Sequence, residues 1–265
     1  MSSSPSPPST KLRVLCLHGA RTNCRVMETQ TRGLRDALGP NAEFIFLNGS
    51  FEARGPTDAI VEKLFGDTAP FFEWWIVRDL ENEEIEDIEA QDGVPQGTAA
   101  RWCHVFEGFD QAIESMDEKL NELGEFDLAV GFSQGAVMLT ILSMWYHKKT
   151  PTKPWWKLVL CVCGVYPRGI NVRELFEEND GKPILVPFPS IHVVGQKDSL
   201  YKESLVLKDM YTPHARGSPL ERLLIEHDGG HKFPSPGRHT KFYADLADTI
   251  WQFFTDIHHN SVARL

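Results

Sequence analysis

The chain has 265 residues, of which 42% are hydrophobic and 11% aromatic, enough to form the core of one large domain. Its formal net charge of −10 disfavours nucleic acid or an anionic membrane as the main partner. We therefore expect one globular domain that acts on a small or acyl-type molecule.

The two ends of the chain indicate the bounds of the domain, and the cysteines indicate its cellular compartment. Residues 1–10 are rich in Ser and Pro and lack the apolar stretch of a secretion signal, so we expect a disordered tail. No later stretch is apolar for long enough to span a bilayer. The five cysteines show no C-x-x-C spacing, which is typical of free thiols in a reducing interior. We expect a cytoplasmic protein with one domain at 11–256 and a C-terminal tail at 257–265.

The first elements predict a strand, helix, strand unit. Apolar runs at 12–19 and 43–49 each end in glycine, as buried parallel strands do. Between them, residues 22–39 carry apolar side chains at helical spacing, and Pro40 follows as a stop signal.

Residues 50–105 interrupt this regular pattern. Clusters of Pro, Gly and aromatic residues alternate there with the acidic run at 79–93. We expect an irregular, partly helical cap-like insertion, and we interpret the acidic run as a solvated face or a mobile loop.

Alternating elements return after this insertion. Helices are expected at 106–123, 135–146 and 241–254, and strands at 126–132, 156–166, 190–195 and 222–228. Alternating strands and helices in a chain of this length predict an α/β fold, with a mainly parallel sheet and helices on both of its faces.

Ser133 lies between Gly131 and Gly135, in the sequence GFSQG. By composition alone, G-x-S-x-G is expected by chance in roughly one chain in ten of this length. Here the motif follows a predicted strand and precedes a predicted helix, which is the context of a nucleophile elbow. The glycines then allow strand and helix to approach closely. We predict that Ser133 is a nucleophile.

A serine hydroxyl needs a base, and His231 is the best candidate among ten histidines. It follows the last predicted strand through a glycine pair, at the sheet edge where ligands of parallel sheets bind. His227, nearer the strand, is the main rival. His18 is expected to shape its loop, and His192 is expected to be a core residue of its strand.

Asp198 is the best candidate for the acid that orients the base. It comes a few residues after a predicted strand, and the chain order Ser, Asp, His is that of α/β-hydrolases. Asp127 stands at the start of its strand, which is the wrong end of the sheet, and Asp228 is the fallback.

Acyl transfer also needs two backbone N–H donors for the oxyanion. One is expected from Gln134, the residue after the nucleophile, and the other from Ala20, in the loop after the first strand.

Other classes of site fit less well. The loop after the first strand has neither of the glycine-rich phosphate motifs, and no H-E-x-x-H or similar metal spacing occurs. We therefore expect no cofactor and no metal. A non-catalytic α/β-hydrolase used as a binding module stays open, because a fold alone does not establish activity.

Four stretches together resemble the fungal serine hydrolase family, within the α/β-hydrolases. They are LCLHGARTN at 15–23, GFSQGA at 131–136, HVVGQKD at 192–198 and HDGGHKFP at 227–234. Carried over by position, the resemblance implies the α/β-hydrolase fold with Ser133 as nucleophile, Asp198 as acid and His231 as base.

The resemblance also implies an activity. Members of this family are acyl hydrolases without cofactors, and the opening of the chain is most similar to the branch that releases polyketides from synthases in secondary metabolism. We expect a serine hydrolase that cleaves an ester or thioester, with the acyl chain held on a carrier domain of a polyketide synthase. A general carboxylesterase is the alternative.

Four residues are predicted to contact the substrate. Arg21 stands where many relatives have a small residue, and it could meet an anionic part of the substrate or a carrier-bound pantetheine phosphate. Phe71, Trp74 and Trp75, together with Phe72, either fill the core or form part of an apolar wall for an acyl chain.

Overall fold

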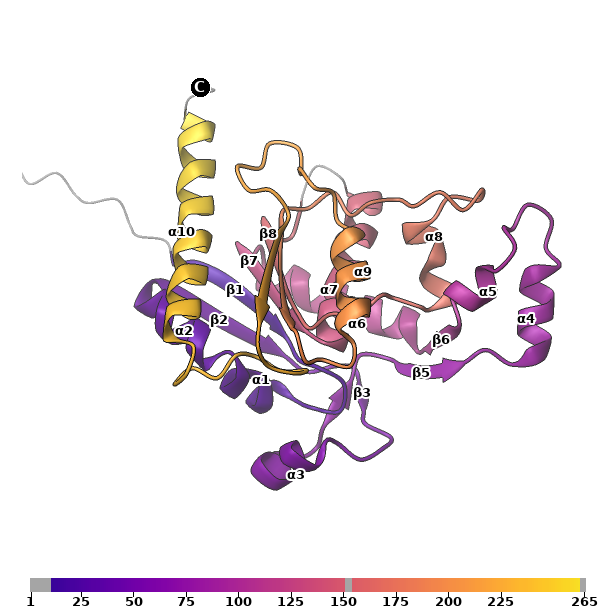
Figure 1. Cartoon of the computed structure of the whole chain (residues 1–265), viewed down its shortest axis with the longest axis horizontal. Coiled ribbons are helices and arrows are strands. Elements are labelled where there is room, and N and C mark those ends of the chain that lie inside the picture. The colour runs from indigo at the N-terminus through magenta and orange to yellow at the C-terminus, as the bar shows by residue number, and fades with distance from the viewer. Residues whose placement is uncertain (1–10, 151–153, 263–265) are drawn as a thin grey trace, which may run out of the picture.

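The computed structural model describes residues 11–150 and 154–262 (Figure 1). The tail expected at 1–10 lies outside the described residues. At the centre is a sheet of six strands in the order β10-β9-β8-β7-β1-β2, and every neighbouring pair is parallel. These strands are β1 (Leu12–Leu17), β2 (Ala42–Leu47), β7 (Leu128–Phe132), β8 (Leu158–Val162), β9 (Ser190–Gly195) and β10 (Leu223–His227).

Helices cover both faces of the sheet, because successive strand residues point to opposite sides. Leu15 and Leu17 of β1 pack in one core with residues of α6 (Phe109–Leu123), α7 (Gln134–Lys149) and α9 (Tyr201–Asp209). Val14 and Cys16 pack in the other core with residues of α1 (Cys24–Gln30), α2 (Arg32–Leu38) and α10 (Thr240–Val262). Figure 1 shows α10 and α2 on one side of the sheet and α7 and α9 on the other. The chain therefore has the predicted doubly covered α/β sheet.

Several elements differ from the predicted bounds. The helix expected at 22–39 is divided into α1 and α2 at Thr31, whose hydroxyl donates to the Met27 carbonyl oxygen (2.8 Å). The helix expected from residue 106 begins at Phe109, because Gly108 has a φ of 75°. Strand β8 ends before Cys163, which has a φ of 47°.

The last helix is longer than expected. Helix α10 continues beyond residue 254 to Val262, through most of the segment that we expected to be a tail. Its apolar side chains Leu246, Ile250 and Phe253 are buried against the sheet.

Residues 51–107, which we call the inserted segment, contain two small antiparallel sheets and three α-helices. The sheets pair β3 (Phe51–Glu52) with β4 (Phe72–Glu73), and β5 (Ile76–Asp79) with β6 (His104–Glu107). The helices are α3 (Ala59–Phe65), α4 (Asn82–Glu89) and α5 (Thr98–Arg101). The expected irregular cap thus has defined strands, and the acidic run forms α4, with a capping box at Glu81 and Glu84.

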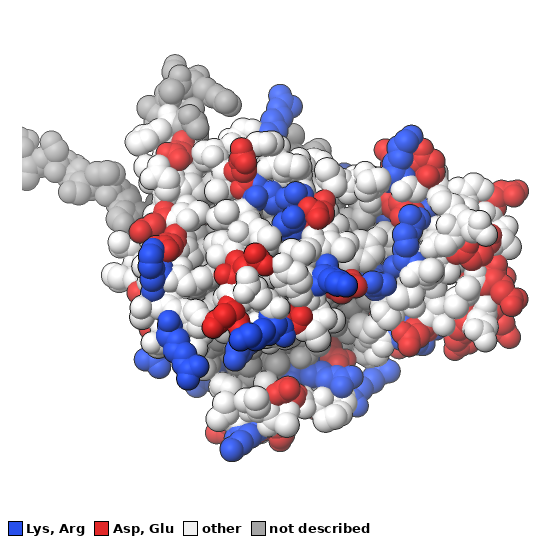
Figure 2. All heavy atoms as spheres, in the orientation of Figure 1, with Lys and Arg blue, Asp and Glu red and all other residues white. Residues whose placement is uncertain are grey.

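Helix α4 lies at one end of the molecule and is exposed along its length. It contains no buried residue, and Figure 2 shows acidic side chains gathered at this end. A short helix, α8 (Arg173–Phe176), lies between the inserted segment and the sheet in Figure 1. No helix in the described ranges is long and apolar enough to cross a membrane.

Candidate active site

Ser133 occupies a sharp turn between β7 and α7. All five residues of β7 are buried, and the strand delivers Ser133 directly to the first turn of α7. The φ of Ser133 is 50° and its ψ is −119°, a conformation that side-chain-bearing residues rarely adopt. Such strain is typical of functional turns that the surrounding fold holds in place.

The two flanking glycines leave no room for a side chain. A Cβ at Gly131 would lie 2.5 Å from the Cα of Ala136, and one at Gly135 would overlap the carbonyl oxygens of Leu17 and His18. The motif is therefore required by the close contact of β7, α7 and β1, as the sequence predicted.

The side chains of Ser133, His231 and Asp198 form one chain of hydrogen bonds. Oγ of Ser133 lies 2.9 Å from Nε2 of His231, and Nδ1 of His231 lies 2.7 Å from Oδ2 of Asp198. A carboxylate only accepts, so Nδ1 carries the proton and Nε2 is free to accept from the serine hydroxyl. This arrangement can take the proton of Ser133 as its oxygen attacks an electrophile.

Burial differs along this chain of hydrogen bonds. The Asp198 side chain has no exposed surface, and its second oxygen accepts from the backbone N–H of Leu200 (2.8 Å). The His231 side chain is 31% exposed, and its ring lies 5.3 Å from that of Phe132. The acid is therefore fixed in position, while the base faces the site.

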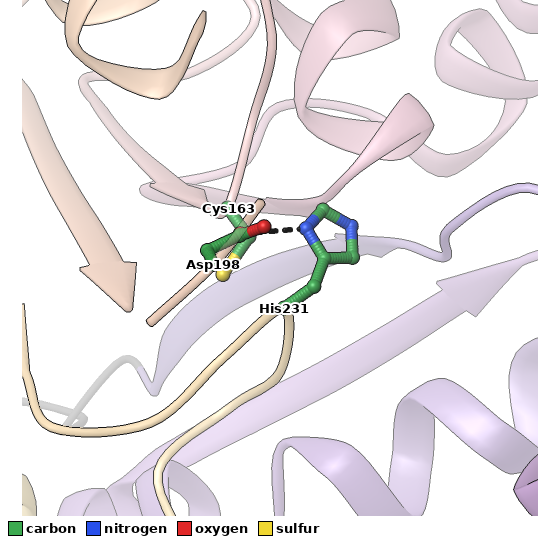
Figure 3. Close-up of side chains that lie close together, drawn as sticks. All are labelled: Cys163, Asp198 and His231. Atoms are coloured by element: carbon green, nitrogen blue, oxygen red, sulfur yellow. Dashed lines mark hydrogen bonds and ion pairs between the residues drawn. The ribbon is translucent and has the colours of Figure 1, made fainter. Parts of the chain in front are cut away.

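The thiol of Cys163 lies beside Asp198 and His231 (Figure 3). The ligand atoms of the three residues are within 4.8 Å of one another, which is close enough to hold a metal ion. However, Asp198 and His231 already bond to each other, and burial, followed by the charge of Asp198, raises the pKa of the Cys163 thiol to about 12. We therefore interpret Cys163 as a neutral thiol packed beside the pair.

The rival residues lie elsewhere. His227 is buried, which lowers its pKa, and its Nδ1 accepts from the N–H of Gly229 (3.1 Å). Asp228 contacts His239 (3.1 Å), and Asp127 contacts Lys157 (2.7 Å). The geometry therefore favours His231 and Asp198.

His18 fixes the loop that carries Ala20. Its Nδ1 donates to the Gly19 carbonyl oxygen (2.7 Å), and its Nε2 accepts from the N–H of Gly49 (2.9 Å). Burial lowers the pKa of His18 to about 4, so the ring is neutral at pH 7. His18 therefore shapes its loop, as the sequence analysis predicted. Ala20 is exposed and lines the cavity at Ser133.

The side chain of Gln134 has a structural role that the sequence analysis missed. Its Oε1 accepts from the N–H of Trp74 (3.0 Å), and its Nε2 donates to the carbonyl oxygen of Trp75 (3.0 Å). These two bonds join the elbow to the inserted segment.

The backbone N–H of Gln134 lies in the first turn of α7, and the N–H groups in the first turn of a helix have no acceptor within that helix.

A cavity of about 420 Å³ opens at Ser133. Its apolar wall comes from both the inserted segment and the sheet domain, and consists of Trp75, Val77, Phe106, Val137, Val165 and Leu200. Apolar pockets with a few polar groups are typical of small-molecule sites. The arrangement can therefore hold an apolar group next to the Ser133 hydroxyl.

Comparison with known proteins agrees with this geometry. A family model described as serine hydrolase (FSH1) matches residues 7–243. The chain belongs to this serine hydrolase family. It is 29% identical over 245 residues to Esterase OVCA2 of Homo sapiens, covering 89% of this chain and 96% of that protein. It is also 29% identical over 239 residues to Hydrolase phiM of a fungal species (strain ATCC 74256), covering 86% of this chain and 89% of that protein.

A solved structure supports the fold of this FSH1-family chain. The acyl-protein thioesterase 2 of Zea mays has a TM-score of 0.54 and 18% identity, covering 93% of this chain and 97% of that chain. The fold is that of the α/β-hydrolases, and the family assigns the protein to the enzymes that hydrolyse esters. The prediction of a serine hydrolase is confirmed, and the alternative of a non-catalytic binding module is set aside.

Three of the four predicted substrate contacts do not line the cavity of this serine hydrolase. Arg21 is paired with the buried Glu73, with Nε 2.7 Å from Oε1, so its charge is already satisfied. The side chain of Trp74 is completely buried, and its Nε1 donates to the His18 carbonyl oxygen (2.8 Å). Phe71 is half-buried outside the cavity, and Trp75 alone lines it. Arg21 and Phe71 therefore lie away from the cavity, which corrects our expectation of substrate contact, and Trp74 fills the core, which was the alternative.

Polar residues that the sequence analysis did not select also line the cavity. Arg168 pairs with Glu203 (2.7 Å) at the wall, and Tyr166 lies beside them. Burial raises the pKa of Tyr166 to about 12, so its hydroxyl stays neutral. Tyr166 and Arg168 lie in the loop after β8, a position at the carboxyl edge of the sheet that could have marked them.

Proposed function

We propose that the protein hydrolyses an acyl ester or thioester through Ser133, His231 and Asp198. Ser133 attacks the acyl carbonyl while His231 takes its proton, and Asp198 holds the imidazole and stabilises the imidazolium. The observation that carries this proposal is the unbroken chain of hydrogen bonds, of 2.9 and 2.7 Å, that ends on a strained serine.

The oxyanion is proposed to bind at the N–H groups of Gln134 and Ala20. Gln134 opens α7, whose N-terminus carries a partial positive charge, and Ala20 lines the same cavity. His231 then returns its proton to the leaving group. Water, activated by His231, attacks the acyl-enzyme and frees the acid and Ser133.

We further propose that the acyl group is a polyketide chain delivered as a thioester on a carrier domain. The apolar wall of the cavity supports a hydrocarbon-rich acyl group, and the resemblance of residues 15–31 to the polyketide-releasing branch supports the carrier. The five free cysteines fit the proposed location in a reducing cytoplasm. Simple ester hydrolysis is the second candidate, favoured by the name Esterase OVCA2 of a relative.

Turnover of matched substrates tests the chemistry. The rates of an octanoyl oxygen ester, an octanoyl thioester and an octanoyl carrier protein are measured with the native enzyme and with Ser133→Ala. We expect the variant to lose at least about 10⁴-fold in kcat/KM, because members of such a set act as a unit. Ser199→Ala, which alters an exposed serine on a neighbouring loop, is the matched control.

The three substrates separate the candidates. A kcat/KM for the carrier-bound thioester at least tenfold above the free thioester supports carrier delivery. Equal values for the two thioesters, with a faster oxygen ester, favour the simple esterase. Near-native turnover by Ser133→Ala would contradict the whole proposal.

A further inference from the structure

A second cavity, of about 310 Å³, lies within the two loops that carry Asp198 and His231. It shares no lining residue with the cavity at Ser133, and we call it the rear cavity. Lys197, which precedes Asp198, and Lys232, which follows His231, both line it. The loops are joined by the Lys197 N–H, which donates to the Gly229 carbonyl oxygen (2.9 Å). A ligand in the rear cavity would therefore contact both loops.

The rear cavity is rich in cations although the chain has a net charge of −10. Lys197, Lys232 and Arg238 line it and are exposed, and none forms an ion pair with any residue in the described ranges. By contrast, acidic side chains gather at the end of the protein that carries α4 (Figure 2). Unpaired cations converging on one hollow indicate an anionic ligand.

The one carboxylate among the described residues that line the rear cavity already has a hydrogen-bond partner. Oδ1 of Asp228 lies 3.1 Å from Nε2 of His239, and Nδ1 of His239 lies 3.1 Å from the carbonyl oxygen of Ser235. The hydrogen bond from His239 lowers the pKa of Asp228, which keeps it ionised. Three cationic side chains therefore face a single carboxylate that is bonded to His239, and positive charge is in excess in the rear cavity.

The buried ring of His227 supplies a further donor. Its Nδ1 accepts from the N–H of Gly229, so the proton of the neutral ring is on Nε2. This Nε2 is buried and has no hydrogen-bond partner among the described residues. His227 lines the rear cavity, so an anion held there, directly or through a water molecule, would supply the missing acceptor.

We propose that the rear cavity binds the phosphate group of a small phosphate ester and thereby holds the Asp198 and His231 loops together. Three cationic side chains suit a dianionic phosphate better than a single carboxylate. The volume is at the lower end of the range for ligand pockets, about 300–1,000 Å³, which suits a phosphate with a short organic group. Salt bridges from Lys197 and Lys232 to one phosphate would join the two loops, and Arg238 would anchor it from the segment before α10.

Thermal unfolding with inorganic phosphate tests binding directly. At pH 7, phosphate is compared with potassium chloride of equal ionic strength. At tenfold above its Kd, phosphate should raise Tm by about 4 °C, and chloride should not. Hydrogen exchange on the same samples should show increased protection at 195–200 and 228–239 and no change in α4.

Variants locate the site. Lys232→Met and Arg238→Met should each weaken phosphate binding at least tenfold by calorimetry, while the conservative Lys232→Arg keeps it. Lys202→Met is the matched control, because Lys202 is also exposed and lies on α9 outside the rear cavity. An equal loss in Lys202→Met, or a Tm shift with chloride as large as with phosphate, would overturn the proposal. So would phosphate binding that survives in the double variant Lys232→Met/Arg238→Met.

The phosphate can be free or part of a larger group, and two further probes distinguish these sources. 4′-Phosphopantetheine that binds at least tenfold more tightly than inorganic phosphate, with pantetheine not binding, would assign the site to the phosphate of a carrier arm. Equal affinity for inorganic phosphate and phosphopantetheine would show that the site recognises the phosphate group alone, as in a free small phosphate, and not a carrier arm. These binding measurements do not depend on turnover, so they also hold in Ser133→Ala.

Discussion

The nucleophile elbow and the inserted segment at 51–107 are held to the fold in different ways. At the elbow every residue of β7 is buried, and most of α7 is buried against the sheet. In the inserted segment, α3 and α4 bury no residue at all, and Ile60 and Leu64 of α3 are exposed. The elbow is fixed by backbone packing along its whole length, whereas the inserted segment extends away from the sheet.

The inserted segment is anchored at a few large side chains. Trp74, Trp75 and Trp102 are among the most deeply buried residues of the protein. The rings of Trp75 and Phe106 stack with centroids 4.6 Å apart, and Gln134 bonds the backbone of the first two tryptophans. The segment therefore shapes the cavity wall through its anchor points, while α3 and α4 bury no residue and should tolerate substitution. Substitutions should cost stability at the elbow and at the anchors, and little elsewhere in the segment.

The largest expected difference compares two glycines. Gly135→Ala places a Cβ into the carbonyl oxygens of Leu17, at the end of β1, and His18, a backbone overlap that should cost about 3 kcal/mol or more of unfolding free energy. Gly66→Ala, after α3, meets only the flexible Glu62 side chain and has a helical φ of −57°, so it should change stability by less than about 1 kcal/mol. Urea unfolding of both variants measures this. Equal losses would mean that the elbow is not tightly packed.

Acidic pH should destabilise the folded protein through two buried histidines next to the central sheet. Burial lowers the pKa of His18 to about 4 and that of His192 to about 3, from ordinary values near 6.5. Protonation below pH 6.5 therefore favours the unfolded chain. The stability that neutral His18 gives above pH 6.5 is lost as the pH falls to 4, by about 3 kcal/mol.

Unfolding in urea at pH 7, 6, 5 and 4 measures that loss. The loss should be smaller in His18→Asn. Glu84→Gln in α4 is the control. Hydrogen bonding to Arg78 lowers the pKa of Glu84 from 4.5 to about 2, so the stability it contributes is lost only as the pH falls below about 5, and the variant should leave the profile unchanged from pH 7 to 5. A profile that is flat from pH 7 to 4 would contradict the buried neutral state of both histidines.

A smaller effect is expected at the bond between the two regions. Gln134→Leu keeps the backbone N–H but leaves the Trp74 N–H and the Trp75 carbonyl oxygen without partners, which should cost about 2 kcal/mol. Because Trp75 lines the cavity, KM should rise more than kcat falls. Gln91→Leu, at an exposed glutamine of the inserted segment, is the control and should change stability by less than about 0.5 kcal/mol. Equal stability and equal KM in the two variants would contradict the idea that Gln134 anchors the inserted segment.

The sequence predicted the sheet and the Ser133 turn because both depend on local patterns. A buried parallel strand is a continuous apolar run, and the elbow needs glycine at fixed positions. It favoured His231 but kept His227 as a rival, since His227 ends β10 and His231 follows it by four residues, and only the path of the loop decides which one faces Ser133. The hydrogen bonds of Gln134 to the backbone of Trp74 and Trp75, and the burial of Trp74, depend on contacts between residues about sixty positions apart in the chain. Composition carries no signal for such contacts.

Labelling with a fluorophosphonate probe tests the central claim most directly, because the probe reacts with a serine only where a base and an oxyanion site activate it. The protein is labelled at pH 7, and the modified residue is located by mass spectrometry. We predict a single phosphonylated serine at Ser133, a labelling rate at least about 10³-fold lower in His231→Ala, and no labelling in Ser133→Ala. Folded native protein that stays unlabelled, or that is labelled at another serine, would contradict the account.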